Sequence, residues 1–197
     1  MKIKEILLDA GGVYLKGSFV DFVNKAYKIL NIDDKFETSK EVVFDPNLNR
    51  GTVTVEECFR KYFNALISEN QMEKLIKLWN STWVADEEMI KLVKLLKKNY
   101  KLAIFSNSDA NNDKIYRKKG WYDYFDHLIL SHEIGIIKPD ERIYRIALKK
   151  LELEPEECLV IDDQEDCLIP AEKLEMKTLL FESPSKLKKD LKKLKII

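Results

Sequence analysis

The chain has 197 residues, 45% hydrophobic and 35% charged, which suits one sizeable soluble domain or one domain with an insertion. Basic and acidic residues number 34 each, so the net charge is zero and gives no electrostatic reason to expect nucleic acid or a membrane as a partner. The three cysteines share no CxxC spacing, which argues against zinc or a disulfide framework. No stretch approaches the ~18 apolar residues of a membrane span, and the N-terminal apolar run is too short for a signal sequence. We expect a cytoplasmic protein.

Five short apolar runs along the chain predict β-strands. They do not alternate with polar residues, which is typical of strands buried on both faces of a parallel sheet. Amphipathic segments such as "DERIYRIALKKL" separate the later four runs and predict helices. Strand alternating with helix indicates an α/β fold with a doubly wound sheet. The five runs are residues 3–9, 101–107, 127–131, 158–163 and 177–181.

The gap between the first two runs is much longer than one crossover needs, and its pattern is helical. "SFVDFVNKAYKIL" carries an apolar stripe, and "TVEECFRKYFNAL" opens with a capping box in which Glu57 follows Thr54 by three residues. "DEEMIKLVKLLKKNY" reads as the crossover helix that leads into the second strand. We therefore predict a helical cap domain over residues 17–84, inserted into an α/β core of residues 1–16 and 85–197.

Polar side chains stand at the ends of these strands, where open α/β sheets bind their ligands. The first run ends in Asp9, the second in Ser106 and Asn107, and the fourth in an acidic pair, Asp162 and Asp163. "GIIKPDERIY" after the third run adds Lys138 to this set. Packing alone does not explain three carboxylates, a hydroxyl and a lysine at one edge of a sheet.

These groups have complementary chemistry. Crowded carboxylates repel one another and favour a hard divalent cation, and Mg²⁺ often takes one or two carboxylates together with a substrate phosphate. A carboxylate such as Asp9 can attack phosphorus and form an acyl phosphate, while Ser106 and Lys138 hold the phosphoryl oxygens. Gly11 and Gly12 let the loop after Asp9 approach metal and phosphate closely.

Four segments in order, "LLDAGGV", "IFSNS", "GIIKPDERIYRIAL" and "VIDDQEDCLIPAEKLEM", resemble the motifs of the haloacid dehalogenase (HAD) superfamily. The similar branch is subfamily IA, which carries a helical (C1-type) cap between its first and second motifs. No single motif is specific, but four in the right order at strand ends are a strong signal. The resemblance implies a Rossmann-like parallel sheet with strand order 5-4-1-2-3, and the strand–helix alternation agrees with it.

The resemblance also implies a magnesium site. Asp9 would be a ligand as well as the nucleophile, and the main-chain carbonyl of Gly11 would be a second ligand. Asp163 would bind the metal directly, and Asp162 would bind it or support its waters.

The remaining motif residues would act on the phosphate. Ser106 would bind it with Asn107 beside it, and Lys138 would neutralise both the nucleophile and the phosphoryl oxygens. The implied enzyme is a Mg²⁺-dependent phosphatase for a small phosphorylated metabolite, working as a monomer or homodimer.

The chain departs from the family pattern two residues after the nucleophile. Phosphatases of this family usually have an aspartate there, which protonates the leaving oxygen and then activates water, but this chain has Gly11. Acid–base catalysis typically contributes ~10²–10⁴-fold, so the enzyme could be slow. Two alternatives stay open: a metal-independent 2-haloacid dehalogenase, against which the Asp162–Asp163 pair argues, and a non-catalytic binding protein of the same fold.

Specificity in this architecture would lie in the cap. There "FDPNLNRG" is polar and turn-rich, and Asp45, Asn47 and Arg50 are candidates for contacting the substrate, although a plain connecting loop explains them as well. We interpret Trp79 and Trp83 as cap core. The two histidines show no acid–base partner pattern, and we interpret His127 as a strand-edge residue and His132 as a loop residue.

Overall fold

The computed structural model describes residues 2–32, 45–63 and 66–197. Its centre is a parallel five-stranded sheet in the order β5-β4-β1-β6-β7. Counted along the sequence and read from β7, this is the predicted order 5-4-1-2-3. The strands are β1 (Glu5–Leu8), β4 (Lys101–Ser106), β5 (His127–Leu130), β6 (Cys158–Asp162) and β7 (Lys177–Leu180).

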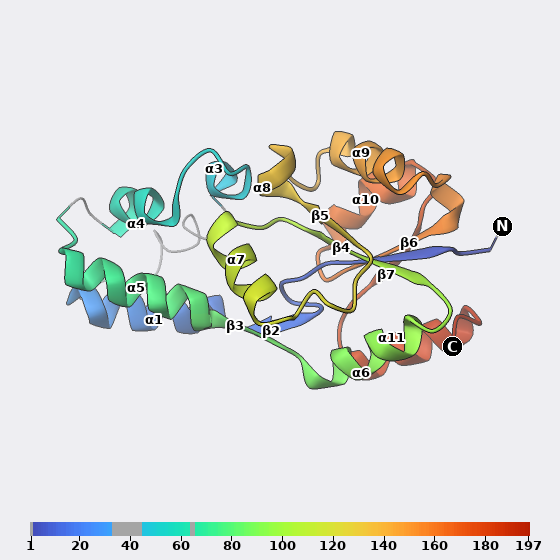
Figure 1. Cartoon of the computed structure of the whole chain (residues 1–197), viewed down its shortest axis with the longest axis horizontal. Helices are drawn as coiled ribbons and strands as arrows, with labels where there is room; N and C mark the ends of the chain where they lie inside the picture. Colours follow the sequence, from blue (N-terminus) through green and yellow to red (C-terminus); the bar gives the residue numbers. More distant parts are fainter. Residues whose placement is uncertain (1, 33–44, 64–65) are drawn as a thin grey trace.

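Helices cover both faces of the sheet, which explains the continuous apolar runs (Figure 1). All residues of β1 are buried: Ile6 and Leu8 face one apolar cluster and Leu7 the other. The first cluster includes α6 (Glu87–Leu96), α7 (Ala110–Lys118) and α11 (Pro184–Lys193). The second includes α9 (Glu141–Leu151) and α10 (Glu165–Lys173). Short helices α8 (Ser131–Ile134) and η1 (Pro155–Glu157) complete this part.

The helices between β2 and β3 pack around an apolar cluster of their own, at one end of the molecule (Figure 1). Phe22, Phe59 and Trp79 meet there with ring centroids 5.0–6.0 Å apart. The capping box predicted at Thr54 is present: Thr54 N donates to Glu57 and Glu57 N donates to Thr54 Oγ1. The division into core and cap domains stays a prediction. These helices are α1 (Phe19–Leu30), α3 (Pro46–Asn49), α4 (Val55–Phe63) and α5 (Glu69–Thr82).

A two-stranded antiparallel ribbon joins the helices to the sheet, and the sequence analysis did not predict it. It consists of β2 (Leu15–Gly17) and β3 (Trp83–Ala85), where the chain leaves the sheet region and returns to it. Gly17 allows the close pairing, since a Cβ there would lie 2.4 Å from the Thr82 carbonyl oxygen.

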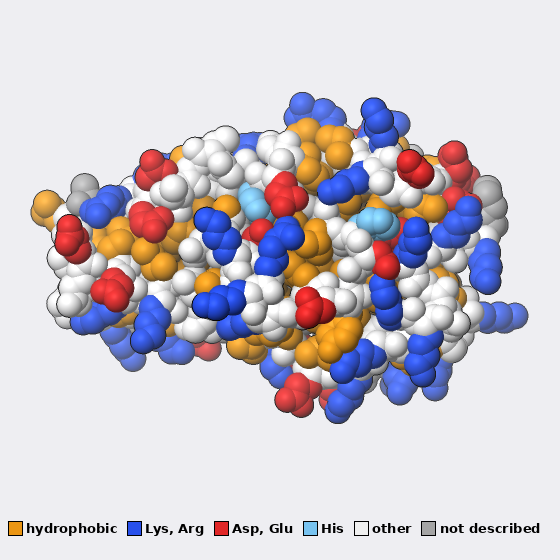
Figure 2. Space-filling view, viewed as in Figure 1, with side chains coloured by type: hydrophobic (Ala, Val, Ile, Leu, Met, Phe, Trp, Pro, Cys, Tyr) orange, Lys and Arg blue, Asp and Glu red, His pale blue; other side chains and the backbone are white. Residues whose placement is uncertain are grey.

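The surface carries both signs of charge in mixture, with no face of one sign in the view of Figure 2. Within the described part of the chain, no helix has the length and apolar character that crossing a membrane requires.

Candidate active site

The polar groups predicted from the strand ends, with the exception of Asp162, line one cavity of about 220 Å³. Asp9 follows β1 directly, and its backbone N–H donates to the Ile161 carbonyl of β6, which fixes it at the carboxyl edge of the sheet. Ser106 ends β4 and Asp163 follows β6. Asp9, Ser106, Asn107, Lys138 and Asp163 all line the cavity, so residues far apart in sequence face one space.

Lys138 is a buried cation that contacts two carboxylates of the site. Its side chain is 2% exposed, and Nζ donates to Asp9 Oδ1 at 2.8 Å and to Asp162 Oδ2 at 2.5 Å. Burial acts to lower the pKa of Lys138, but the two carboxylates outweigh it and raise the pKa above its ordinary value. Lys138 is therefore a permanent cation between two acids.

Burial and mutual repulsion raise the pKa values of Asp9 and Asp163. Burial raises the pKa of Asp9 to about 6, with Asp162 and Asp163 adding to the rise and Lys138 opposing it. Burial and the neighbouring Asp162 also raise the pKa of Asp163. One ammonium does not compensate three acids, so the site retains an affinity for a further cation.

The acidic set fits a magnesium ion. Asp9, Asp162 and Asp163 each offer an oxygen, and these oxygens all lie within 4.8 Å of one another. Asp162 has both oxygens engaged already, by Lys138 Nζ and by the Gln164 backbone N–H, which suits a supporting role. Asp9 and Asp163 are then the better direct ligands. The predicted carbonyl ligand at Gly11 stays a prediction.

Gly12 shapes the metal side of the cavity. It has a φ of +88°, and a Cβ at this position would lie 2.3 Å from Asp163 Oδ2. Only glycine allows this backbone conformation and this approach to the carboxylate. The neighbouring Gly11 differs, since among the described residues a Cβ there would meet nothing nearer than Trp83 at 3.9 Å. The position of the missing acid–base group is therefore sterically open.

Asn107 positions Lys138. Its Nδ2 donates to the Lys138 carbonyl at 2.9 Å, and its Oδ1 accepts from the Lys138 backbone N–H at 2.8 Å. Nδ2 keeps a second N–H, and Asn107 lines the cavity, but its contact with phosphate stays a prediction. Ser106 is 3% exposed and donates only to the Asn107 carbonyl, at a long 3.2 Å, so its hydroxyl can turn toward a phosphate.

The opposite wall comes largely from residues that the sequence analysis did not assign to the site. Trp79 belongs to the core of the helical segment, as predicted, but it also lines the cavity. The interpretation of Trp83 as cap core is wrong, because Trp83 lies in β3 and packs against the first apolar cluster of the sheet; it too lines the cavity. The four-residue spacing of the two tryptophans in a helical pattern did not indicate that they line the cavity. Polar residues missed at this wall include Asn49, Ser108, Asp109 and Asn112.

Asp45, Asn47 and Arg50 do not line this cavity. Asp45 is the N-cap of α3, where it accepts from the Asn47 backbone N–H at 2.7 Å, and it also accepts from the Tyr62 hydroxyl at 3.0 Å. A structural role accounts for its burial. The same loop does reach the cavity, but through Asn49, and substrate contacts by the three predicted residues stay a prediction.

Comparison with known proteins agrees with this geometry. The family model for haloacid dehalogenase-like hydrolases matches residues 4–172. D-ribitol-5-phosphate phosphatase of Bacteroides thetaiotaomicron is 26% identical over 172 residues, which cover 82% of this chain and 83% of that protein. Bifunctional epoxide hydrolase 2 of Rattus norvegicus is 36% identical over 70 residues, which cover 36% of this chain and only 13% of that protein.

Solved structures show the same fold. A HAD family enzyme from Bacteroides thetaiotaomicron superposes with a TM-score of 0.77 at 23% identity, covering 92% of this chain and 95% of that one. A mutant of that enzyme, solved with magnesium and inorganic phosphate, gives a TM-score of 0.76 at 24% identity, with coverages of 91% and 94%. With a family model over most of its length and the motif residues gathered at one cavity, this chain belongs to the haloacid dehalogenase-like hydrolases.

Proposed function

We propose that this protein is a Mg²⁺-dependent phosphatase that acts on a small phosphorylated metabolite through an aspartyl-phosphate at Asp9. The observation that carries the proposal is the buried Lys138 ammonium between Asp9 and Asp162, with Asp163 completing an acidic set around the same cavity. A related protein is named as a D-ribitol-5-phosphate phosphatase, and a similar structure was solved with magnesium and inorganic phosphate.

Each residue of the site has a separate role in the proposed reaction. Asp9 attacks phosphorus, the P–O bond to the leaving group breaks, and water then cleaves the acyl phosphate to regenerate Asp9. Lys138 keeps Asp9 ionised and neutralises the phosphoryl oxygens, and the Ser106 hydroxyl donates to one of them. Asp9 and Asp163 would hold Mg²⁺, with Asp162 in support, and the ion would supply further positive charge to the phosphoryl group.

Gly11 determines which leaving groups react well. With no carboxylic acid at this position, esters with a leaving group of low pKa need the least help, because they depart without a proton. We therefore expect aryl and acyl phosphates to react fastest.

The cavity also limits the substrate class. Among the described residues that line it, Lys138 is the one cationic side chain, and two carboxylates already bind it. A second anionic group on the substrate would find no countercharge. The volume of about 220 Å³ and the aromatic wall suit a small monophosphate with a neutral remainder.

The test is hydrolysis of a panel that pairs aryl and acyl phosphates with sugar and nucleotide monophosphates, with Mg²⁺ and with chelator. The native chain is expected to turn over with Mg²⁺ only, and Asp9→Asn is expected to be inactive. Gly11→Asp is expected to raise the rate on alkyl phosphates above that of the native chain, since the position is sterically open. Full turnover by Asp9→Asn would contradict the mechanism.

Two other results would replace the proposal. Release of halide from a 2-haloacid without metal would identify a dehalogenase. No turnover by the native chain, with activity appearing only in Gly11→Asp, would favour a non-catalytic binding protein. The proposal includes a cytoplasmic location and a monomer or homodimer, which cell fractionation and light scattering would check.

A further inference from the structure

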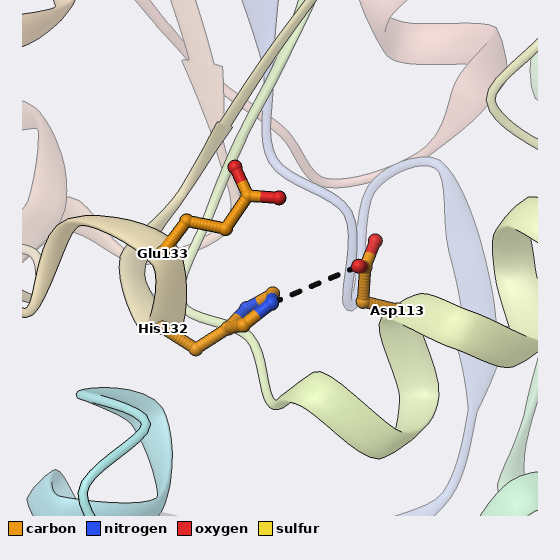
Figure 3. Close-up of side chains that lie close together, drawn as sticks. All are labelled: Asp113, His132 and Glu133. Carbon is orange, nitrogen blue, oxygen red and sulfur yellow. Dashed lines mark ion pairs between the residues drawn. The ribbon is translucent and has the colours of Figure 1, made fainter.

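A hydroxyl, an imidazole and a carboxylate lie one after another in space beside the candidate active site. Ser108 Oγ lies 2.8 Å from His132 Nδ1, and His132 Nε2 lies 3.7 Å from Asp113 Oδ2. Figure 3 shows the His132 ring directed at the Asp113 carboxylate, with Glu133 beside it. The three residues come from the loop after β4, from α8 and from α7. His132 thus lies in a short helix, whereas the sequence analysis interpreted it as a loop residue.

Only Ser108 reaches the cavity. It lines the same space as Asp9 and is partly exposed, whereas the side chains of His132 and Asp113 are 8% and 9% exposed. Its backbone N–H donates to Ser131 Oγ at 2.9 Å, which fixes the loop. The hydroxyl is therefore the accessible end of a buried chain of polar groups.

Asp113, His132 and the adjacent Glu133 could offer metal ligands, but they are not arranged as a metal site. The Arg117 guanidinium already serves as their cation: Nε lies 2.8 and 2.9 Å from the two Asp113 oxygens, and Nη2 lies 2.9 Å from Glu133 Oε1. A divalent ion would have to displace a well-formed Arg–carboxylate pair. The Arg117 ion pairs do not explain why the His132 imidazole contacts the hydroxyl of Ser108, which lines the cavity.

We propose that Ser108 and His132 form a proton relay that serves the reaction in place of the carboxylic acid absent at Gly11. Ser108 is the catalytic residue, because it faces the substrate, and His132 is the positioning residue that supplies and recovers the proton. The inference rests on the proposed phosphatase function.

The proton transfers balance over one turnover. When the P–O bond breaks, the leaving oxygen takes the Ser108 Oγ proton, and Oγ takes the proton from His132 Nδ1, which leaves a neutral ring. When water attacks the aspartyl-phosphate, Ser108 Oγ accepts the water proton while its own proton passes to His132 Nδ1. The enzyme returns to its starting state, and no other reactant is consumed.

Charged groups face His132 from the helices packed against it. Asp113 on α7 faces Nε2, and Arg117 on the same helix is bound to Asp113. Glu133, next to His132 on α8, adds a negative charge that Arg117 partly neutralises. From the α3 side, Gly51 packs against the His132 backbone.

The test compares leaving groups. A proton donor matters for alkyl phosphates, whose alkoxide leaves poorly, and hardly matters for aryl phosphates such as p-nitrophenyl phosphate. In Ser108→Ala and in His132→Gln, kcat/KM for glycerol phosphate is expected to fall about 10²-fold, the lower end of acid–base catalysis, with p-nitrophenyl phosphate changed little. The double variant is expected to match the single ones, because the two residues act as a unit.

A pH profile separates a relay from a structural role. With glycerol phosphate, the native kcat/KM is expected to fall on the alkaline side as the imidazolium is lost, and this limb should disappear in His132→Gln. The matched control is His127→Gln: His127 is the other histidine and pairs with Glu5 at the amino end of β1, so its replacement should leave both substrates and the pH profile unchanged.

Several outcomes would overturn the relay. They are equal losses for aryl and alkyl substrates, no loss in either variant, or a native chain that hydrolyses aryl phosphates alone. If His132→Gln does not fold, as judged by circular dichroism, Ser108→Ala carries the same comparison. A native chain inactive on every phosphate would refute the proposed function itself, and the aryl assay identifies that case separately.

Discussion

The side-chain amide of Asn107 is hydrogen-bonded to both polar backbone groups of Lys138, a residue 31 positions away. This pairing holds the end of β4 against the loop after α8 and brings the Lys138 ammonium between Asp9 and Asp162. Asn107 therefore influences the reaction through Lys138.

Replacing Asn107 is expected to lower both stability and turnover. Asn107→Leu removes both hydrogen bonds at similar volume and leaves a backbone donor and acceptor of Lys138 unpaired, at a cost of about 1–3 kcal/mol in the free energy of unfolding. Asn107→Asp keeps the acceptor for the Lys138 N–H and should fall between native and Asn107→Leu. Urea unfolding and p-nitrophenyl phosphate hydrolysis would measure this series. The control is Asn70→Ala on the exposed side of α5; equal effects at positions 70 and 107 would contradict the assignment.

The two glycines after Asp9 are expected to respond oppositely to the same added methyl group. Gly11→Ala should fold and bind Mg²⁺ normally, because its Cβ meets only Trp83 at 3.9 Å. Gly12→Ala should lose Mg²⁺ affinity and activity, since its Cβ would lie 2.3 Å from Asp163 Oδ2 and its φ is +88°. Isothermal titration with Mg²⁺ would compare them, and normal metal binding by Gly12→Ala would show that the loop can move.

The strands of the sheet could be predicted correctly because the evidence for each of them, an unbroken apolar run, is local in the sequence. Strands such as β1 and β6 are covered on both faces, so their apolar runs are unbroken, and the strand–helix alternation restricts the topology. The β2–β3 ribbon escaped prediction for the opposite reason. Each strand has three residues, which is too short for periodicity, and the partners Leu15 and Ala85 lie 70 positions apart.

The residues of the candidate site also fall into those that local sequence predicts and those that it does not. Asp9, Ser106 and Asp163 could be predicted because they end a strand or follow one directly, and parallel strands bring their carboxyl ends to one edge. Ser108, Asn49 and Trp79 could not, because their place at the cavity depends on how helices and loops fold over that edge. The same holds for the pairing of His132 with Ser108, because the two residues lie 24 positions apart and no local pattern connects them.

Asp9 is expected to make the metal-free protein less stable as the pH rises. Its pKa in the folded protein is about 6, above the ordinary 3.8, so the folded state binds this proton more tightly than the unfolded chain does. The resulting stabilisation is complete below about pH 4 and is lost as the pH rises through 6. The raised pKa of Lys138 adds stability that stays constant across this window.

The difference between Asp9→Asn and native separates this effect from that of carboxylates outside the site, which contribute equally to both, and includes the release of Asp162 and Asp163 from the Asp9 charge. Without metal, the Tm of the variant minus that of the native protein should grow from pH 4 to pH 7 by several degrees, at about 2–4 °C per kcal/mol. Saturating Mg²⁺ should reduce the difference, because the ion compensates the Asp9 charge in the native protein alone. A difference that shrinks with pH in chelator would contradict the raised pKa.

Ser131 connects three parts of the fold through one buried hydroxyl. Its Oγ is inaccessible to solvent, accepts from the Ser108 backbone N–H at 2.9 Å and donates to the Asn49 carbonyl of α3 at 2.6 Å. Ser131→Ala should lower the free energy of unfolding by about 1–3 kcal/mol, because both partners lose their hydrogen bond.

This substitution should also raise KM for glycerol phosphate, since Asn49 and Ser108 both line the cavity and would lose their common anchor. The matched control is Ser81→Ala, whose exposed hydroxyl donates only to the Leu78 carbonyl within α5. Urea unfolding and steady-state kinetics on both variants would measure the two effects. A Ser131→Ala protein as stable as the control, with an unchanged KM, would mean that α3 is held over the cavity by its apolar contacts and that the Ser131 hydroxyl is dispensable.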